Sequence, residues 1–348
     1  MDAFVRIGAA LIGLLLIFAF LRSASRVALV NRKRGDWLAR AIGWFVHTTL
    51  GWLARTQSKY ENIQDVLAWV LPLYILFVIV VWFGLALAGF GLLNWSCQAE
   101  RSLPEAMIAS GSQLSTLGFL APLDTAGRML AIAEGAVGLG IVVFYFTFVP
   151  GYQTTIQLRE VKVAWLYARG SPGLTNFTLL EWFLRTGGSD WNGLWEDWES
   201  WFRNIGESHG LAPVLAFVPT VHPDQTWLAA AAVVLDSASF YLSAIEAQGE
   251  LSAAVCHRTG VDALRLVATL FADRYAGSEL QGGRRLSRSD FDLAYDRFAT
   301  LGAKVRAERE SCWLRFVELR QEYEALLQRL AKALLAPTND GLLLPLKA

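Results

Sequence analysis

The sequence predicts an all-α membrane protein that continues into an α-helical soluble domain. Residues 66–99 contain no Asp, Glu, Lys or Arg, and residues 129–158 contain one, Glu134. Charged side chains are interspersed throughout the rest of the C-terminal half. The 54% apolar residues are therefore concentrated in segments long enough to cross a bilayer. We divide the chain into residues 1–64, 65–150 and 151–348.

Three apolar segments are candidate membrane spans: residues 3–21, 66–94 and 127–149. The third has 23 residues, which corresponds to about 34 Å of helix and covers the hydrocarbon thickness of a membrane. The lipid bilayer is thus an expected partner. The first segment makes residues 1–64 an additional N-terminal transmembrane region ahead of the other two spans.

Basic residues predict the orientation of the spans. The connection between the second and third spans carries only Arg101 and Arg128. The connection between the first and second carries many more: Arg22, Arg26, Arg32, Lys33, Arg34, Arg40, Arg55 and Lys59. Because basic loops stay in the cytoplasm, we expect a multi-pass protein of the inner (plasma) membrane. Its N-terminus would lie outside and its C-terminal domain in the cytoplasm.

Residues 1–21 have an alternative interpretation as a cleaved signal peptide, since small residues Ser23, Ala24 and Ser25 follow the apolar run. Cleavage would send the basic connection across the membrane, which the distribution of basic residues opposes. Within that connection, residues 36–56 place Trp37, Trp44 and Trp52 at helical spacing. This pattern predicts an amphipathic helix lying at the membrane interface.

Between the second and third spans lies a short, partly polar segment. Pro104 is followed by "EAMIASGSQLST", which reads as a short helix with Glu105 near its positive end. At about 12 residues it is too short to cross a membrane. Non-helical backbone survives at membrane depth only when protein buries it or when it lines a water-filled cavity. A re-entrant helix followed by a Gly-containing extended segment would meet this condition if it lines a pore.

Residues 65–165 resemble the pore module of potassium-channel-like tetrameric cation channels, including bacterial proteins with a helical cytoplasmic region. The shared order is an outer helix, a short pore helix, T-x-G-[YF], a proline, Gly-Arg and a glycine-rich inner helix. In that family the backbone carbonyls of a T-V-G-Y-G filter replace the water shell of the ion. The resemblance places the ion filter at Thr116, Leu117, Gly118, Phe119 and Leu120.

Because a ring filter needs four such loops, the resemblance also implies a homotetramer that conducts a monovalent cation such as K⁺ or Na⁺. The sequence differs from the family motif in places. Leu120 stands at the second filter glycine, and Ala121 stands where the family usually has aspartate. Leucine reaches positive φ only at a cost, so the outermost carbonyl ring would be rearranged or absent. A pore-like architecture follows from the resemblance, whereas potassium selectivity does not.

The third span contains the other candidate site residues. Glu134 is an ionisable residue inside a span, where such residues are costly. It would either support the pore helix and filter, through groups such as Ser112 and Ser115, or line the cavity and attract cations. A gating hinge is possible at three glycines of this span, although close helix packing explains them equally well. These glycines are Gly135, Gly138 and Gly140.

The soluble half reads as helices throughout. Trp191, Trp195, Trp198 and Phe202 form a helical stripe typical of a packed core. Residues 226–247 are apolar enough to suggest a fourth span, but Asp236 and several serines favour a buried bundle helix. Further helices are expected at 250–275, 287–301 and 306–335.

Several function classes find little support. Dispersed cysteines (Cys97, Cys256 and Cys312) and scattered histidines predict neither a disulfide framework nor a metal site. We find no arrangement of side chains typical of a catalytic site, no cofactor motif and no reason to expect a nucleic-acid partner. Two hypotheses remain: a cation channel gated or assembled through its cytoplasmic domain, with an unknown cytoplasmic ligand, or a non-conducting membrane scaffold or signalling protein that keeps a pore-like module.

Overall fold

The computed structural model describes residues 2–28, 36–97, 102–120, 122, 125–170, 173–220, 222, 225–269 and 286–336. These residues are mostly helical, and an isolated β-bridge joins Ile245 and Val305. The chain divides into two units. Unit 1 comprises residues 1–49 and 69–154, and unit 2 comprises residues 50–68 and 155–348. Each unit is described by itself.

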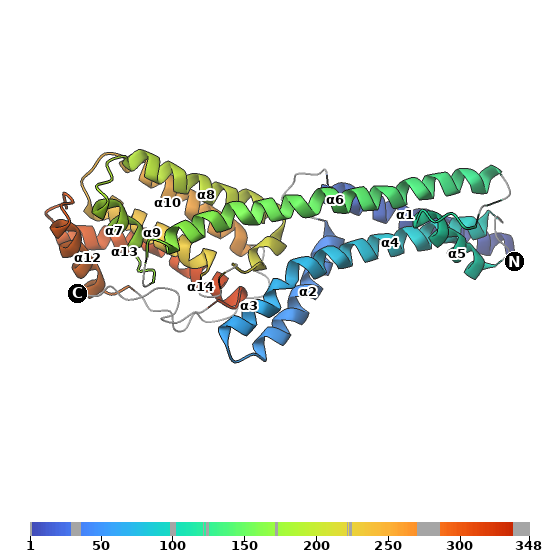
Figure 1. Ribbon diagram of the computed structural model, residues 1–348, viewed down its shortest axis with the longest axis horizontal. Helices are drawn as coiled ribbons and strands as arrows, with labels where there is room; N and C mark the ends of the chain where they lie inside the picture. Colours follow the sequence, from blue (N-terminus) through green and yellow to red (C-terminus); the bar gives the residue numbers. More distant parts are fainter. Residues whose placement is uncertain are drawn as a thin grey trace. The chain divides into compact units, whose positions relative to one another are not determined.

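Unit 1 contains the predicted membrane segments. Its helices are α1 (Asp2–Ala28), the first part of α2 (Trp37–Arg55), α4 (Val70–Ser96), α5 (Leu103–Leu114) and α6 (Thr125–Tyr167) as far as Thr154. Figure 1 shows α1, α4 and α5 running beside the first half of α6. The three predicted spans therefore correspond to α1, α4 and α6. Helices α1 and α6 are longer than the sequence pattern suggested, whereas α4 begins four residues later and ends two residues later than the predicted span.

Four helical stretches among the described residues are long and apolar enough to cross a membrane, and their burial separates them into two kinds. The stretches in α1, in α3–α4 and in α6 are 17%, 28% and 17% buried inside the structure, whereas the one in α9 (Trp227–Ala244) is 94% buried. A helix wrapped by protein on every side belongs to a bundle core. The structure thus agrees with a multi-pass membrane protein and with a buried bundle helix at 227–244.

Glycines allow α1 and α4 to pack closely. A Cβ atom on Gly13 would lie 2.7 Å from the carbonyl oxygen of Gly89, and one on Gly89 would lie 2.9 Å from that of Gly13. Near the other end of the pair, the Arg6 guanidinium donates to the Trp95 carbonyl at 3.2 Å and stacks over its ring. Small residues permit this approach in lipid. The two glycines thus set a close approach of α1 to α4, and the choice between a retained span and a cleaved signal peptide stays a prediction.

The start of α2 is joined to both α1 and α4 by buried polar side chains. Asp36 caps α2 by accepting from the backbone N–H groups of Leu38 (3.1 Å) and Ala39 (3.0 Å). Ser23 donates to the same carboxylate oxygen at 2.7 Å, and the Trp82 indole donates to Ser23 at 2.9 Å. The predicted helix over 36–56 is confirmed. Its Trp37, Trp44 and Trp52 side chains are exposed, as the interfacial placement, still a prediction, requires.

The third span differs most from expectation. The sequence predicted its end at residue 149, but α6 is one helix of 43 residues with Pro150 in its interior. A proline removes one backbone hydrogen bond from a helix. In a helix this long the remaining bonds continue on both sides, and Thr154 adds a side-chain bond to the Pro150 carbonyl at 3.0 Å.

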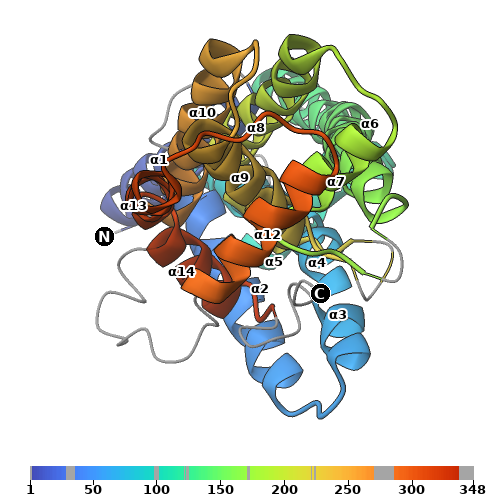
Figure 2. The same ribbon diagram turned by 90° about the vertical axis from the view of Figure 1, so that its left-hand side faces the viewer.

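Unit 2 is a helical bundle built around α9. Figure 2 shows α9 surrounded by the other helices of the unit. The elements of this unit are, besides α9 and the end of α6, α3 (Tyr60–Ala68), α7 (Thr178–Arg185), α8 (Trp191–Leu211), the 3₁₀ helix η1 (Pro213–Phe217), α10 (Glu250–Thr269), α12 (Arg288–Thr300), α13 (Arg309–Gln321) and α14 (Glu324–Ala333).

The aromatic stripe of α8 packs in this core as predicted, since Trp195, Trp198 and Phe202 are at most 1% exposed. The single helix expected over 306–335 is wrong, because the chain turns between α13 and α14 at Glu322 and Tyr323. The turn carries Tyr323 into the core, where its hydroxyl donates to Asp236 of α9 at 2.6 Å. A buried tyrosine needs such a partner for its hydroxyl.

Candidate functional site: helix α5 and the turn that follows it

Helix α5 begins with a complete capping box. The Ser102 hydroxyl accepts from the backbone N–H of Glu105 at 3.3 Å, and the Glu105 carboxylate accepts from the backbone N–H of Ser102 at 3.2 Å. Pro104 lies in the first turn, where no intrahelical donor is needed. The predicted start near Pro104 is confirmed. The S-x-x-E pattern that specifies the box was readable in the sequence but was not used.

The end of α5 folds back on itself through a Schellman motif. The backbone N–H of Leu117 donates to the Ser112 carbonyl at 3.0 Å, and that of Thr116 donates to the Gln113 carbonyl at 2.9 Å. This pairing requires a left-handed residue after the helix, and Thr116 has a φ of 59°. Gly118 is left-handed as well, with a φ of 65°, and its N–H also reaches Ser112. The predicted filter thus begins as the cap of a helix.

Two side chains of α5 hold the far end of the turn. The Ser112 hydroxyl accepts from the backbone N–H of Leu120 at 3.2 Å, and the Gln113 amide donates to the Leu120 carbonyl. Ser115, by contrast, donates back to the Gly111 carbonyl of its own helix at 2.6 Å. Of the two predicted support serines, Ser112 therefore contacts the turn and Ser115 does not. The sequence interpretation missed Gln113.

The carbonyl groups of the turn differ from its N–H groups in their hydrogen bonding. Among the described residues, none donates a hydrogen bond to the carbonyl oxygens of residues 116–119. The side chains of Leu117 and Phe119 are 72% and 63% exposed in the single chain. Within the part of the chain that the structure describes, the turn therefore directs N–H donors of Thr116, Leu117, Gly118 and Leu120 toward α5, and the side chains of Leu117 and Phe119 form an exposed apolar surface beside it.

Glu134 lies behind α5 rather than in solvent. Its side chain is fully buried, and one oxygen of its carboxyl group hydrogen-bonds to the Ser110 hydroxyl. The same Ser110 hydroxyl lies 3.1 Å from the Leu87 carbonyl of α4. Of the two predicted positions for Glu134, the structure shows the one that supports α5. Its partner is Ser110, which the sequence interpretation missed.

The three glycines of α6 have different surroundings. A Cβ atom on Gly138 would lie 1.8 Å from the Leu114 carbonyl oxygen, which is far inside van der Waals contact. One on Gly135 would make an ordinary contact of 3.7 Å with the Gln113 carbonyl, and one on Gly140 would meet nothing within 4 Å. Gly138 thus allows α5 and α6 to pack closely. A hinge at any of the three stays a prediction.

We expect Thr116→Gly to stabilise the protein by about 1 kcal/mol. A β-branched residue in the left-handed region costs about 1–2 kcal/mol, and glycine carries no such cost. The midpoint of thermal unfolding of the purified protein measures the change. Thr116→Ser is the matched control, because it keeps the Cβ atom and the hydroxyl and should leave the midpoint close to that of the wild type. Equal midpoints for the glycine and serine variants would contradict the strain.

Unit 2 holds two buried polar networks that could have formed a second site. In the first, Arg159 donates to Glu160 at 2.7 Å and to the carbonyls of Leu215 (3.1 Å) and Val218 (2.7 Å), while His209 lies 3.3 Å away. This arginine is 1% exposed. Every donor nitrogen of its guanidinium has a partner, so the network reads as a structural anchor for the end of α6.

The second network surrounds Asp236 of α9. Asn176 and Tyr323 donate to its carboxylate, and Arg320 lies 3.7 Å away as an ion pair. Burial and the charge of Asp236 raise the pKa of Tyr323 well above its usual value, so this hydroxyl stays a donor. Among the described residues, no group of three or more His, Cys, Asp and Glu side chains is placed to hold a metal ion.

Acidification is expected to destabilise unit 2 through two buried histidines. Burial, with a smaller contribution from Arg315, lowers the pKa of His257 to about 4, and burial together with Arg159 lowers the pKa of His209 well below 6.5. Below about pH 6.5 the unfolded chain takes up protons that the folded chain does not. Stability should therefore fall by about 1.4 kcal/mol per pH unit for each histidine.

Unfolding midpoints between pH 7.5 and 5.0 measure this effect. The slope should be shallower for His257→Gln than for the wild type, whereas His222→Gln should leave it unchanged because His222 is exposed. An unchanged slope in His257→Gln would refute the assignment.

Comparison of the chain with protein-family models, with curated proteins and with solved structures found no match. The resemblance to potassium-channel-like proteins therefore rests on the quoted residues alone. A proposed function depends on the geometry of α5 and its turn.

Proposed function

We propose that the protein is a homotetrameric cation channel whose pore module is formed by residues 65–150. The observation that carries this proposal is that none of the described residues donates a hydrogen bond to the carbonyl groups of residues 116–119, which follow a short capped helix and precede a membrane-length helix. Carbonyl oxygens in this arrangement can replace the hydration shell of a monovalent cation such as K⁺ or Na⁺.

The length of α5 supports a re-entrant path. With 12 residues it extends about 18 Å, which is less than the hydrocarbon thickness of a bilayer. The packing of α5 agrees with this path, because Ala106, Ala109 and Leu114 are buried and the Ser110 hydroxyl hydrogen-bonds to Glu134 of α6. In this proposal α5 enters the membrane from the outer side, and the turn returns to the start of α6.

The exposed tip of the turn supports self-association. Leu117 and Phe119 are largely exposed in one chain, and four copies around an axis would cover such side chains while bringing four sets of carbonyls together. Cross-linking of the protein in native membranes measures the oligomeric state. A ladder that ends at four subunits is expected.

Ion flux tests the proposal directly. The purified protein is placed in planar bilayers under opposed potassium and sodium gradients, and the reversal potential is measured. A reversal near the potassium equilibrium value would show potassium selectivity, and one near zero would show a non-selective cation pore. Gly118→Val, which blocks the left-handed backbone of the turn, should abolish the current. No current from the wild type at any voltage or pH would refute conduction.

A second candidate, a non-conducting scaffold or signalling protein with a pore-like module, is favoured by Leu120. Both backbone groups of this residue are engaged by α5, its N–H by Ser112 and its carbonyl by Gln113. The fifth filter position therefore offers no unengaged carbonyl. A stable tetramer without any ion current would support this candidate.

The proposed orientation places the connection between α4 and α5 outside and residues 151–348 in the cytoplasm, where they gate or assemble the pore. Cys97 is exposed at the end of α4, whereas Cys256 and Cys312 are buried. A membrane-impermeant maleimide should label the wild type on intact cells and should fail to label Cys97→Ser. Labelling that requires permeabilised cells would reverse the orientation.

A further inference from the structure

One serine hydroxyl joins α4, α5 and α6 behind the candidate site. The Ser110 side chain of α5 is fully buried, and its oxygen lies 3.1 Å from the Leu87 carbonyl oxygen of α4. The same hydroxyl oxygen hydrogen-bonds to one carboxyl oxygen of Glu134 of α6, whose side chain is also fully buried. Three helices thus meet at a single hydroxyl group, which has one proton to donate.

The two partners of Ser110 differ in what they need from that proton. The Leu87 carbonyl can only accept a hydrogen bond, so it takes the Ser110 proton when this bond forms. The Ser110 oxygen then has only lone pairs left for Glu134, and a hydrogen bond between the two needs a proton on the carboxyl group. An ionised Glu134 would leave one of the two contacts without a proton. Both contacts are satisfied together only when Glu134 is a neutral acid.

The second carboxyl oxygen of Glu134 favours the same protonation state. This Oε2 atom is buried and has no hydrogen-bond partner among the residues that the structure describes. An ionised carboxyl group spreads its charge over both oxygens, and a buried charge without a partner is costly. A buried acid avoids this cost by keeping its proton.

The charged groups on the neighbouring helices do not compensate an ionised Glu134. Helix α4 contains no Asp, Glu, Lys or Arg, and the charged residue of α5, Glu105, is exposed at the start of that helix. Arg128 lies six residues before Glu134 on α6, about 9 Å along the axis, and donates to a backbone carbonyl at 3.2 Å. Arg6 of α1 donates to the Trp95 carbonyl.

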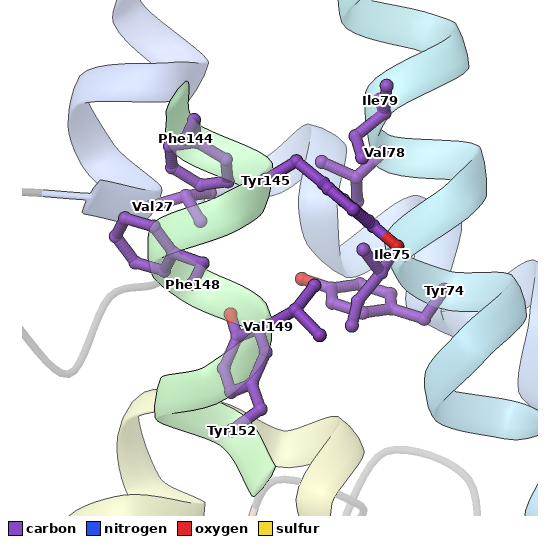
Figure 3. Close-up of a pocket in the computed structure, with 10 residues that line it drawn as sticks. All are labelled: Val27, Tyr74, Ile75, Val78, Ile79, Phe144, Tyr145, Phe148, Val149 and Tyr152. Carbon is purple, nitrogen blue, oxygen red and sulfur yellow. The ribbon is translucent and has the colours of Figure 1, made fainter. Parts of the chain in front are cut away.

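A cavity in unit 1 is too distant to hydrate the carboxyl group. It lies between α1, α4 and α6, and Figure 3 shows Tyr74 reaching from α4 toward α6 among its walls. Its volume of about 20 Å³ has room for about one water molecule. The first α6 residue in its lining is Phe144, ten residues and about 15 Å after Glu134. A water molecule held there cannot solvate the Glu134 charge.

We propose that Glu134 carries a proton at neutral pH and that this proton ties α6 to α5. The acid donates to Ser110, and Ser110 donates to the Leu87 carbonyl. Because Ser112 and Gln113 of α5 hold the far end of the turn, loss of the proton at alkaline pH would loosen the helix that positions the turn. The inference goes beyond the proposed channel and does not depend on ion conduction.

Infrared spectroscopy of the purified full-length protein at neutral pH tests the protonation. A protonated carboxylic acid has a carbonyl stretch at higher frequency than a carboxylate or an amide. The wild type should show this band, and Glu134→Gln should lack it. Glu105→Gln, at an exposed position, is the matched control and should keep the band. If Glu134→Gln removes no such band from the wild-type spectrum, the proposal is overturned.

Thermal unfolding from neutral to alkaline pH tests the link to α5. Glutamine cannot ionise, and its amide can still donate to Ser110, so Glu134→Gln should fold. As the pH rises, the midpoint of the wild type should fall by a few degrees relative to this variant, because the folded wild type then has to lose its buried proton. Parallel midpoints for the two proteins over the whole range would overturn the role of the proton in holding α5.

Discussion

Replacing Gly138 with alanine is expected to destabilise unit 1 by about 1–3 kcal/mol. The added methyl group would lie 1.8 Å from the Leu114 carbonyl, so α5 must move away from α6 or the helices must bend, as happens when a packed core is overfilled. The change should lower the midpoint of thermal unfolding by several degrees. It should also reduce any ion current, because the turn at 116–120 is fixed to the same end of α5.

Gly140→Ala is the matched control for this experiment. It adds the same methyl group two residues later on the same helix, where no atom lies within 4 Å. Alanine also favours a helix over glycine by about 1 kcal/mol, so this variant should be as stable as the wild type or slightly more stable. If Gly140→Ala changes gating while its stability is retained, the hinge prediction gains support. Equal destabilisation of both variants would contradict the packing role of Gly138.

Arg159→Met is expected to destabilise unit 2 by about 3 kcal/mol. The substitution removes the donors that satisfy the Leu215 and Val218 carbonyls in the interior, and each unsatisfied buried group costs about 1–3 kcal/mol. Removing one partner of a buried ion pair has effects of about 3–5 kcal/mol. Methionine keeps most of the volume, so the loss reports the hydrogen bonds and the charge rather than a cavity.

Tryptophan fluorescence during thermal unfolding measures this effect, since Trp201 donates to the Arg159 carbonyl and Trp227 lies under its guanidinium. Arg203→Met is the matched control, because the Arg203 side chain is 66% exposed and pairs with Glu199 on the surface of α8. A surface pair of this kind contributes at most about 1 kcal/mol. A similar loss in the two variants would show that Arg159 does not anchor the helix.

Hydrophobic patterning was sufficient to predict most elements of the fold. The absence of charge over 66–99 located α4, and the spacing of Trp195, Trp198 and Phe202 predicted the buried face of α8. Pattern alone did not reveal that α6 continues through Pro150, because the cost of one missing hydrogen bond depends on the length and surroundings of the helix. The pattern also did not reveal that the helix predicted over 306–335 is interrupted at Glu322 and Tyr323. This interruption depends on the hydrogen bond from the Tyr323 hydroxyl to Asp236 of α9.

The candidate site was predicted by position but not by contact. The sequence identified a short helix, a turn and a buried acid, yet it assigned Glu134 to Ser112 or Ser115 rather than Ser110. The choice between these serines depends on the rotation of α5 about its axis, which spacing along the chain does not determine. The role of Gly138 was similarly open, because a glycine that packs and a glycine that bends look alike until the facing carbonyl is known.

The close contact between α1 and α4 has a consequence for how the protein is made. Gly13 and Gly89 touch across the helix pair, but 76 residues separate them in the chain. At 5–20 residues per second, a ribosome needs about 4–15 s to synthesise that interval. During this time α1 must remain in the bilayer with only lipid against its glycine face, and Arg6 must wait for the Trp95 carbonyl. Until α4 arrives, the apolar length of α1 alone would have to keep this helix in the bilayer.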